Sequence, residues 1–393
     1  MNKIKNATPI VLFTLCACLF TMLDNATGGG GLFKLVALAM DVLVILYCFV
    51  NISNYYYFKH ITFACLFVIV VVLINFILSP YSPRYSLLLK FFGYMTFFIY
   101  AKNLGEKGYI FRCNNFLLYT MIFVPLIVVL LLDKSPNKST YFPNSNMFTY
   151  WGISMSLAYL LLKGINEITK RIAWVILLAY LFVGTSLGIL LAVAISALLL
   201  NIKRVNIFLL IFSVATLLLC VIYIDIPIFA RLKDSFSIFL SLTWEDFTKP
   251  ENVDFYKLQT EHSSSGRTDN ASFLWRIMQW TTLFTGYIKD VICIPFGKGA
   301  DWSIAYTGKP PHNDFVLILT EYGLLIFMII VGALKKIFEK IKNLDIIYFI
   351  LPIFIYHITE NLLDTFPQNI FFYLSLGYYY SLSKSNNESP SYR

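Results

Sequence analysis

Charged residues are scarce in this sequence. They make up 13% of its 393 residues, about half the share of an ordinary globular protein. Apolar residues make up 58%, and the mean hydropathy is +0.69. A chain this poor in charge lacks the polar surface of a soluble enzyme and the charged composition of a disordered protein or a coiled coil. The composition therefore excludes those three classes and indicates a membrane protein.

Motifs for nucleotide, cofactor and metal chemistry are absent as well. The sequence has no Walker A phosphate loop, no Gly-rich dinucleotide fingerprint and no zinc-binding HExxH. Its seven cysteines form no CxxC pair, and no His/Cys cluster suggests a metal site. We therefore predict neither a cofactor nor a metal. An internal repeat, which many transporters carry, is not found either.

Long apolar runs, by contrast, are abundant. A membrane-spanning helix needs about 20 apolar residues, and runs of this kind lie at 10–24, 32–50, 61–79, 86–101, 115–132, 147–163, 205–224, 313–334, 346–363 and 367–382. A further run, 171–200, is interrupted at Gly184–Gly188, and we interpret it as a hairpin of two short helices. The fold class predicted is an all-α polytopic membrane protein with about twelve transmembrane helices.

Basic residues are distributed unevenly among the predicted connections. If both termini lie in the cytoplasm, cytoplasmic segments contain seventeen basic residues, whereas the short outer loops contain three: Arg84, Lys134 and Lys138. The seventeen are Lys3, Lys5, Lys59, Lys102, Lys107, Arg112, Lys163, Lys170, Arg171, Lys203, Arg204, Lys335, Lys336, Lys340, Lys342, Lys384 and Arg393. By the positive-inside rule, the net charge of +9 reports membrane orientation. It implies no nucleic acid partner.

One long segment, 225–313, is then predicted to be external. It separates predicted helices 1–9, in residues 1–224, from helices 10–12, in residues 314–382, and a polar cytoplasmic tail covers 383–393. Within the external segment an apolar stripe recurs every three or four residues, which predicts an amphipathic helix on the membrane surface. The stripe consists of Phe273, Ile277, Trp280, Phe284, Tyr287 and Val291.

The first candidate site is the segment Pro310–Phe315, which reads Pro-Pro-His-Asn-Asp-Phe. Paired prolines suit the start of a helix, so His312 should lie at its outer end. The N-terminus of a helix attracts phosphate, and a neutral His can accept a proton near pH 7. The alternative is that His312 merely caps the helix, with Asn313 and Asp314 bonding its amides.

Two arginines form a second candidate site. Arg267 follows Ser265 and Gly266, and Arg276 lies nine residues further on. A guanidinium binds phosphate oxygens through two parallel N–H bonds. The alternative is that both side chains hold a surface helix against lipid headgroups.

Ionisable residues inside the predicted spans form a third set, because such groups are costly in hydrocarbon and usually functional or paired. The set comprises Lys34, Asp41, Lys90, Glu321, His357 and Glu360. Helical spacing puts Asp314 and Glu321 on one face, and likewise His357 and Glu360. Several of these groups could converge on one outward-facing cavity, while Asp41 could instead pair with a neighbouring helix.

The helix layout and the motifs within 265–323 resemble the bacterial O-antigen ligase/polymerase superfamily. The layout covers nearly the whole chain. The motif match comprises Gly266-Arg267 before a Trp-rich helix and Pro311–Phe315 leading into Leu319–Gly323. The resemblance implies a GT-C-like fold in the bacterial inner membrane. It further implies metal-independent, inverting glycosyl transfer at the periplasmic face from an undecaprenyl-diphosphate-linked glycan.

Under this resemblance, His312 matches the family His that acts as base or orients the acceptor hydroxyl. Arg267 matches the Gly-Arg position, and Arg276 the next basic position. The remaining predicted diphosphate- or glycan-binding residues are Arg84, Lys90, Asn313, Asp314, Glu321, His357 and Glu360. A polymerase of lipid-linked repeat units is our first expectation, and a ligase to lipid A–core is the second. A lipid-linked sugar flippase or transporter is the alternative of another class. A chain-length regulator and a flippase could act as partners of a polymerase.

In one respect the sequence departs from the family. Members usually carry an Arg in the turn between the paired helices, but here the turn has Leu187 after Thr185 and Ser186. Arg84 or Lys90 could supply the missing charge. The departure weakens the ligase interpretation more than the polymerase one.

Overall fold

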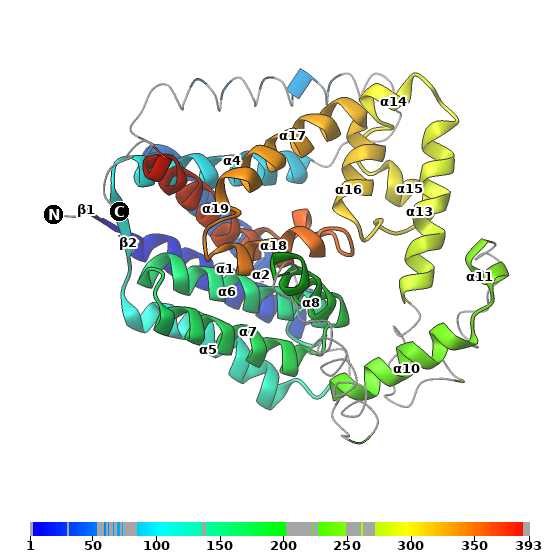
Figure 1. Cartoon of the computed structure of the whole chain (residues 1–393), viewed down its shortest axis with the longest axis horizontal. Helices are drawn as coiled ribbons and strands as arrows, with labels where there is room; N and C mark the ends of the chain where they lie inside the picture. Colours follow the sequence, from blue (N-terminus) through cyan, green and yellow to red (C-terminus); the bar gives the residue numbers. More distant parts are fainter. Residues whose placement is uncertain are drawn as a thin grey trace.

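The computed structural model describes residues 3–29, 31–52, 85–135, 139–201, 227–248 and 272–387, plus a few isolated positions between them. Helices dominate these residues (Figure 1). The predicted helices 61–79 and 205–224 lie largely outside the described residues, and so do Arg84 and Arg267.

Among the described residues, four helical segments are long and apolar enough to cross a membrane. They are α1 (Thr8–Ala26), α2 (Leu32–Val50), α5 (Asn115–Leu132) and the segment Asp314–Ile341. The first three agree with the predicted runs to within two residues at either end. A largely helical structure with these four segments is compatible with the predicted all-α membrane protein, whereas the twelve spans and the GT-C-like fold stay predictions.

Three helices form the centre of the bundle: α4 (Tyr85–Glu106), α6 (Ser145–Lys163) and α19 (Phe366–Asn387), with α19 packed against both others. Helices α4 and α19 approach closely because Gly377 has no side chain. A Cβ at Gly377 would lie 2.0 Å from the carbonyl oxygen of Phe98.

The predicted polar tail from Ser383 begins as helix, because α19 continues to Asn387. Helix α19 packs against α4 as far as its last apolar turns. There, a Cβ at Gly105 of α4 would collide with Ser381 of α19. The backbone therefore stays helical for about a further turn into the polar tail.

A short parallel sheet, which the sequence did not predict, joins β1 (Lys3–Asn6) to β2 (Tyr109–Arg112). The N–H of Ala7 adds a bond of 2.7 Å to the carbonyl of Arg112. The sheet fixes the N-terminus at the end of the bundle where α4 and α6 end and α5 begins. We call this the β-sheet end, and β1 and β2 mark it in Figure 1.

The interrupted run 171–200 forms α7 (Glu167–Gly184) and α8 (Leu187–Asn201), which confirms the predicted break. Thr185, in the turn, has a left-handed φ of 54°. The main contacts of α7 are with α6, however, and those of α8 are with α18 (Ile347–Tyr356). The prediction of a packed hairpin was therefore wrong, because each helix covers a different part of the bundle.

The predicted helix 313–334 is broken. It comprises α16 (Asp314–Leu317), the π-helical turn η2 (Ile318–Tyr322) and α17 (Gly323–Ile341). The loop 297–299 donates backbone N–H bonds of 2.9 and 3.0 Å to the carbonyls of Thr320 and Glu321. Gly323 has a φ of 85°, and a Cβ there would lie 2.4 Å from the nitrogen of Gly297. The backbone of loop 297–299 thus lies against the chain at Gly323. The chain turns there because glycine tolerates a positive φ.

The predicted helix 346–363 is shorter than expected, because α18 ends at Tyr356. A turn follows, and then the 3-10 helix η3 (Leu362–Asp364). His357 and Glu360 therefore lie in a connecting turn, and the prediction that they share a helix face was wrong. The carbonyl of His357 and the side chain of Asn361 accept N–H bonds from the start of α16, and these bonds hold the turn.

The described part of 225–313 folds into short helices: α10 (Pro227–Ser241), α11 (Trp244–Thr248), α13 (Ser272–Ile288), α14 (Cys293–Phe296) and α15 (Trp302–Thr307). The predicted amphipathic helix is α13. Its buried face, however, is formed by Gln279, Leu283 and Tyr287, whereas Phe284 is exposed. The face is rotated by about one residue from the prediction because α13 packs on α15.

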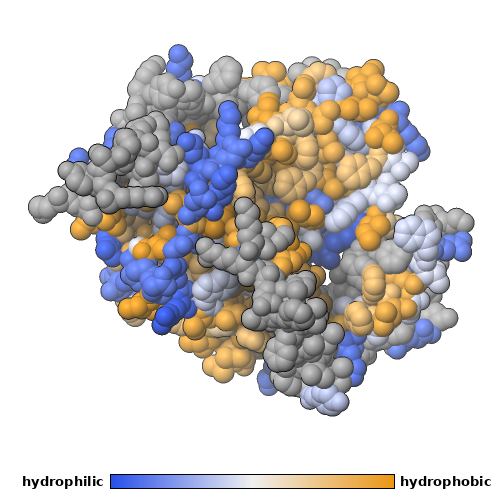
Figure 2. Space-filling model, viewed as in Figure 1, coloured by the Kyte–Doolittle hydropathy of each residue, from blue (hydrophilic) through white to orange (hydrophobic). Residues whose placement is uncertain are grey.

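Large apolar side chains are exposed in stripes along several helices. On α5 they include Phe123, Ile127 and Leu130, and on α7 they include Val175 and Phe182. Figure 2 shows a similar apolar surface where Figure 1 draws α17. Exposed apolar side chains that recur every three or four residues, on helices long enough to span a membrane, are expected of a surface that faces lipid.

Candidate functional site

The site lies where α6, α8 and α16 begin and where α7 and α18 end. This end is opposite the β-sheet end, because α6 begins at the site with Asn146 and ends at Lys163, which bonds Asn115 at the start of α5. Helix α13 crosses this end and holds the loop that carries His312. The amide of Gln279 donates to the carbonyls of Lys309 and Pro310, and the indole of Trp280 donates to the carbonyl of Pro311 at 2.6 Å.

His312 stands immediately before α16 with a left-handed φ of 48°. Asn313 caps the helix, since its side-chain oxygen accepts the N–H bonds of Phe315 and Val316. The N–H of Asp314 donates to the carbonyl of His357 at 2.9 Å. The first amides of α16 are thus occupied, so the predicted phosphate site at this N-terminus was wrong. The cap is Asn313 rather than His312, whose imidazole is left to make other contacts.

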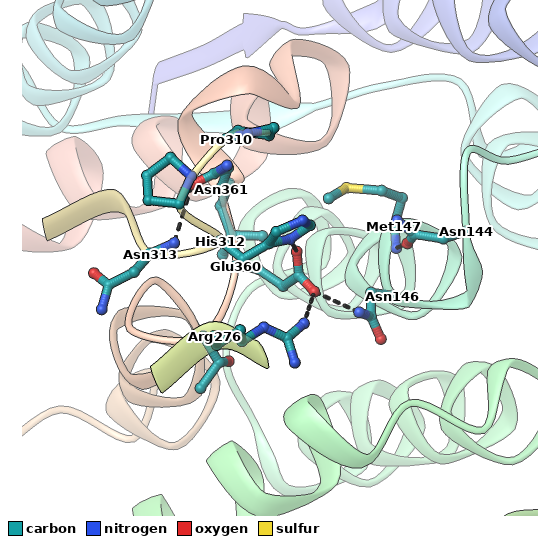
Figure 3. A network of polar contacts seen from close by, with 12 residues as sticks. Asn144, Asn146, Met147, Arg276, Pro310, His312, Asn313, Glu360 and Asn361 are labelled. Carbon is teal, nitrogen blue, oxygen red and sulfur yellow. Dashed lines mark hydrogen bonds and ion pairs between the residues drawn. The ribbon is translucent and has the colours of Figure 1, made fainter. Parts of the chain in front are cut away.

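The imidazole of His312 contacts the carboxylate of Glu360. His312 Nδ1 lies 3.0 Å from Glu360 Oε2, and Arg276 Nη2 donates to Glu360 Oε1 at 2.8 Å (Figure 3). The side chain of Glu360 is 2% exposed, compared with 28% for His312 and 17% for Arg276. A buried carboxylate thus holds together a partly exposed imidazole and a guanidinium from three separate segments.

Two further residues complete the cluster, and sequence reasoning missed both as site residues. Asn146, in the first turn of α6, donates its side-chain N–H to Glu360 Oε1. Ser186, in the turn between α7 and α8, donates its hydroxyl to Asn146 Oδ1 at 2.8 Å. We call Ser186, Asn146, Glu360, Arg276 and His312 the Glu360 cluster.

The sequence held one signal for Ser186, because Gly184–Gly188 matches the GxSxG pattern of esterase nucleophiles. That pattern needs a strand-to-helix turn with an accessible serine. Here it joins two helices, and Ser186 is fully buried with its hydroxyl on Asn146. The turn that carries an Arg in the resembled family therefore contributes a hydrogen-bonding serine to this cluster.

Electrostatics keep Glu360 ionised. Burial alone would raise the pKa of Glu360. The hydrogen bond with His312, the charge of Arg276 and the bond from Asn146 together hold the pKa below its ordinary value. The start of α6 also places the positive end of a helix dipole beside the carboxylate.

An aromatic residue and a lysine border the cluster. The ring of Trp275 meets the imidazole of His312 edge-on, with centroids 5.4 Å apart. Lys309 Nζ lies 5.2 Å from the centroid of Trp275. An indole can stack on a sugar ring and an ammonium can bind phosphate oxygens. Sequence reasoning did not single out Lys309, which is exposed beside the two prolines.

Asp314 and His357 form a second, separate pair. The imidazole of His357 bonds Asp314 through Nδ1, and the same carboxylate accepts backbone N–H bonds from Leu362 and Leu363. The N–H of Asn313 donates to the side chain of Asn361 at 3.0 Å. These bonds tie the turn after α18 to the start of α16, which positions Glu360 beside His312.

Two predicted site residues lie away from the Glu360 cluster. Glu321 accepts bonds from the backbone and hydroxyl of Ser303 at the start of α15. Lys90 of α4 interacts electrostatically with Asp41 of α2. This agrees with the alternative interpretation, in which Asp41 pairs with a neighbouring helix. Glu321 and Lys90 therefore have partners other than the Glu360 cluster among the contacts described, and their binding roles stay predictions. Spacing along single helices could not reveal that η2 turns Glu321 toward α15.

In the part of the chain that the structure describes, no three His, Cys, Asp or Glu side chains are grouped as metal ligands. The Glu360 cluster offers one acid, one imidazole and one guanidinium. It suits proton transfer and binding of an anionic group.

No protein-family model matches this chain, and no curated protein matches its sequence significantly. The resemblance to the O-antigen ligase/polymerase superfamily therefore rests on the helix layout and on the motifs within 265–323.

Proposed function

We propose that this chain is a membrane glycosyltransferase that polymerises lipid-diphosphate-linked oligosaccharide repeat units of a bacterial surface polysaccharide. The observation that carries the proposal is the His312–Glu360–Arg276 arrangement, at the end of the bundle opposite the basic β-sheet end. By the positive-inside rule, the β-sheet end is cytoplasmic and the Glu360 cluster faces the periplasm.

The chemistry of the cluster supports glycosyl transfer without a nucleotide. A sugar hydroxyl becomes a nucleophile when a base takes its proton, and His312 is the partly exposed base of the cluster. Transfer would form a bond from this oxygen to the anomeric carbon of the donor, while the bond from that carbon to the diphosphate breaks with inversion. The proton passes to His312, and the lipid diphosphate leaves with the bonding electrons.

Cations near His312 would stabilise the leaving diphosphate. Arg276 supplies a guanidinium, whose five N–H donors allow one side chain to contact both a carboxylate and a phosphate. Lys309 provides an ammonium 5.2 Å from the centroid of the Trp275 ring. Under the family resemblance, Arg267 would add a third cation. A lipid tail on the donor accounts for a site built at the end of a membrane bundle.

Gene deletion followed by gel analysis of lipopolysaccharide tests the proposal. A polymerase mutant retains core carrying a single repeat unit. Core without repeat units, with accumulated lipid-linked polymer, would identify the ligase instead. Core with neither product would indicate a flippase or an earlier step and would overturn the glycosyltransferase assignment. Leu187 in place of the family Arg weighs against the ligase, because the turn then lacks a phosphate-binding charge.

A further inference from the structure

The carboxylate of Glu360 has two chemically different oxygens. Oε1 accepts from Arg276 Nη2 at 2.8 Å and from the side-chain N–H of Asn146. Oε2 faces Nδ1 of His312 at 3.0 Å. Glu360 is almost completely buried, so these protein groups determine which atoms carry hydrogen. The guanidinium and the amide are donors, and both are committed to Oε1.

Asn146 is held in this orientation by its other side. Ser186 donates its hydroxyl to Asn146 Oδ1 at 2.8 Å, so the NH₂ group must point toward Glu360. Rotating the amide by half a turn would place its oxygen against the carboxylate and lose both bonds. Ser186 is fully buried in the turn between α7 and α8. This turn therefore fixes the acceptor role of Oε1.

An ionised carboxylate has no hydrogen to donate, so Nδ1 of His312 must carry the proton of their shared bond. In a neutral imidazole the other nitrogen, Nε2, then has the free lone pair. We propose that Glu360 is a positioning residue that holds His312 in the Nδ1–H tautomer and thereby makes Nε2 the proton acceptor. The tautomer follows from the hydrogen bonds alone, and its catalytic meaning rests on the proposed function.

Substitution of Glu360 by Gln should reverse the tautomer with almost no change in volume. Glutamine has one oxygen and one NH₂ group at its end. Two donors, from Arg276 and Asn146, meet at the Oε1 position, so the carbonyl oxygen of Gln must occupy it. The NH₂ group then faces Nδ1 of His312 and donates to it. His312 would carry its proton on Nε2 and could no longer accept one from a hydroxyl.

The test is ¹⁵N NMR of the imidazoles in the full-length protein labelled with ¹⁵N-histidine and reconstituted in lipid nanodiscs. The chain has four histidines, and the His312 signals are those lost in His312→Asn. We expect the Nδ1–H signature in the wild type and the Nε2–H signature in Glu360→Gln. The matched control is Glu321→Gln, a second buried carboxylate that bonds Ser303, and it should leave the His312 signature unchanged.

Kinetics supply the second readout. Turnover of lipid-linked repeat units by Glu360→Gln should fall by about 10²- to 10⁴-fold in kcat, with KM little changed, because the base is lost while binding groups remain. A merely structural role for Glu360 would lower the amount of folded enzyme without changing the tautomer of His312.

The outcomes separate the inference from the proposed function. An Nε2–H signature in the wild type, or an unchanged signature in Glu360→Gln, overturns the inference. If the tautomer reverses but wild-type protein transfers no sugar, the role of Glu360 stands and the proposed function fails. If Glu360→Gln does not fold, the wild-type spectrum still decides whether His312 carries its proton on Nδ1.

Discussion

The part of the chain that the structure describes holds two histidine–carboxylate pairs a few residues apart, His312 with Glu360 and His357 with Asp314. In each pair a His Nδ1 faces a buried carboxylate. The side chain of His312 is 28% exposed, whereas that of His357 is 9% exposed. The carboxylate partners differ as well. Glu360 is bonded by side chains of Arg276 and Asn146, and Asp314 by backbone amides of η3 and by His357.

This difference shows how similar chemistry serves two purposes. Asp314 accepts backbone N–H bonds and so connects the turn after α18 to the start of α16, and its partner imidazole, His357, is enclosed. A carboxylate bonded by side chains leaves a neighbouring imidazole partly accessible. We therefore assign the His357–Asp314 pair to structure and the His312–Glu360 pair to chemistry. The four predictions that follow test this assignment, from the largest expected effect to the smallest.

The largest effect is expected for His312→Ala. Removal of the base should lower sugar transfer by about 10²- to 10⁴-fold. The unfolding temperature should fall less than in Asp314→Ala, because Glu360 keeps its bonds from Arg276 and Asn146. Polymer length on lipopolysaccharide gels and thermal unfolding in detergent are the measurements. Wild-type polymer at equal expression would contradict a catalytic His312 and would remove the distinction between the two pairs.

Asp314→Ala should act on stability instead. It removes the acceptor of two backbone N–H groups and of His357 in a buried setting, which should lower the unfolding free energy by about 3–5 kcal/mol. Chemical denaturation of the purified protein measures the change. A stable Asp314→Ala protein without activity would show that Asp314 belongs to the chemistry, contrary to our assignment.

The pH dependence of stability tests the environment of Glu360. Because the pKa of Glu360 is lowered in the folded protein, its contribution is fully present above the unfolded value of about 4.3. The contribution is lost as the pH falls through the lower folded value. We expect Glu360→Gln to unfold at a lower temperature than the wild type at pH 7, and the two curves to converge as the pH falls below the folded pKa of Glu360. Parallel curves would mean that Glu360 is not stabilised by Arg276 and His312.

The smallest effect is expected for Ser186→Ala. Loss of one neutral hydrogen bond to Asn146, worth about 1 kcal/mol, should reduce transfer several-fold by loosening the orientation of the amide. Initial rates of polymer formation measure this change. Ser196→Ala is the control, since Ser196 is equally buried on α8 but bonds only the carbonyl of Ala192 among the contacts described. Equal rates for both variants would exclude Ser186 from the cluster.

Helices α1, α2 and α5 could be predicted closely from the sequence because hydrophobic length is a local property. The runs 32–50 and 115–132 became α2 and α5 without change of a residue. The helix ends near the site were misjudged where tertiary contacts intervene. Helix α18 stops at Tyr356 because the next residues bond the start of α16, and the 313–334 run breaks at Gly323 because loop 297–299 packs against it.

By itself, then, the sequence determined an apolar helical chain, the break near Ser186, and His312 at the start of a helix, because length, turn residues and prolines act locally. The tertiary structure alone decided that Glu360 joins His312 to Arg276 and that Glu321 and Lys90 lie elsewhere. The residues of the cluster are separated by up to 214 positions in the chain. Periodicity within single helices carries no information about such contacts, which arise when the ends of several helices and one crossing helix meet.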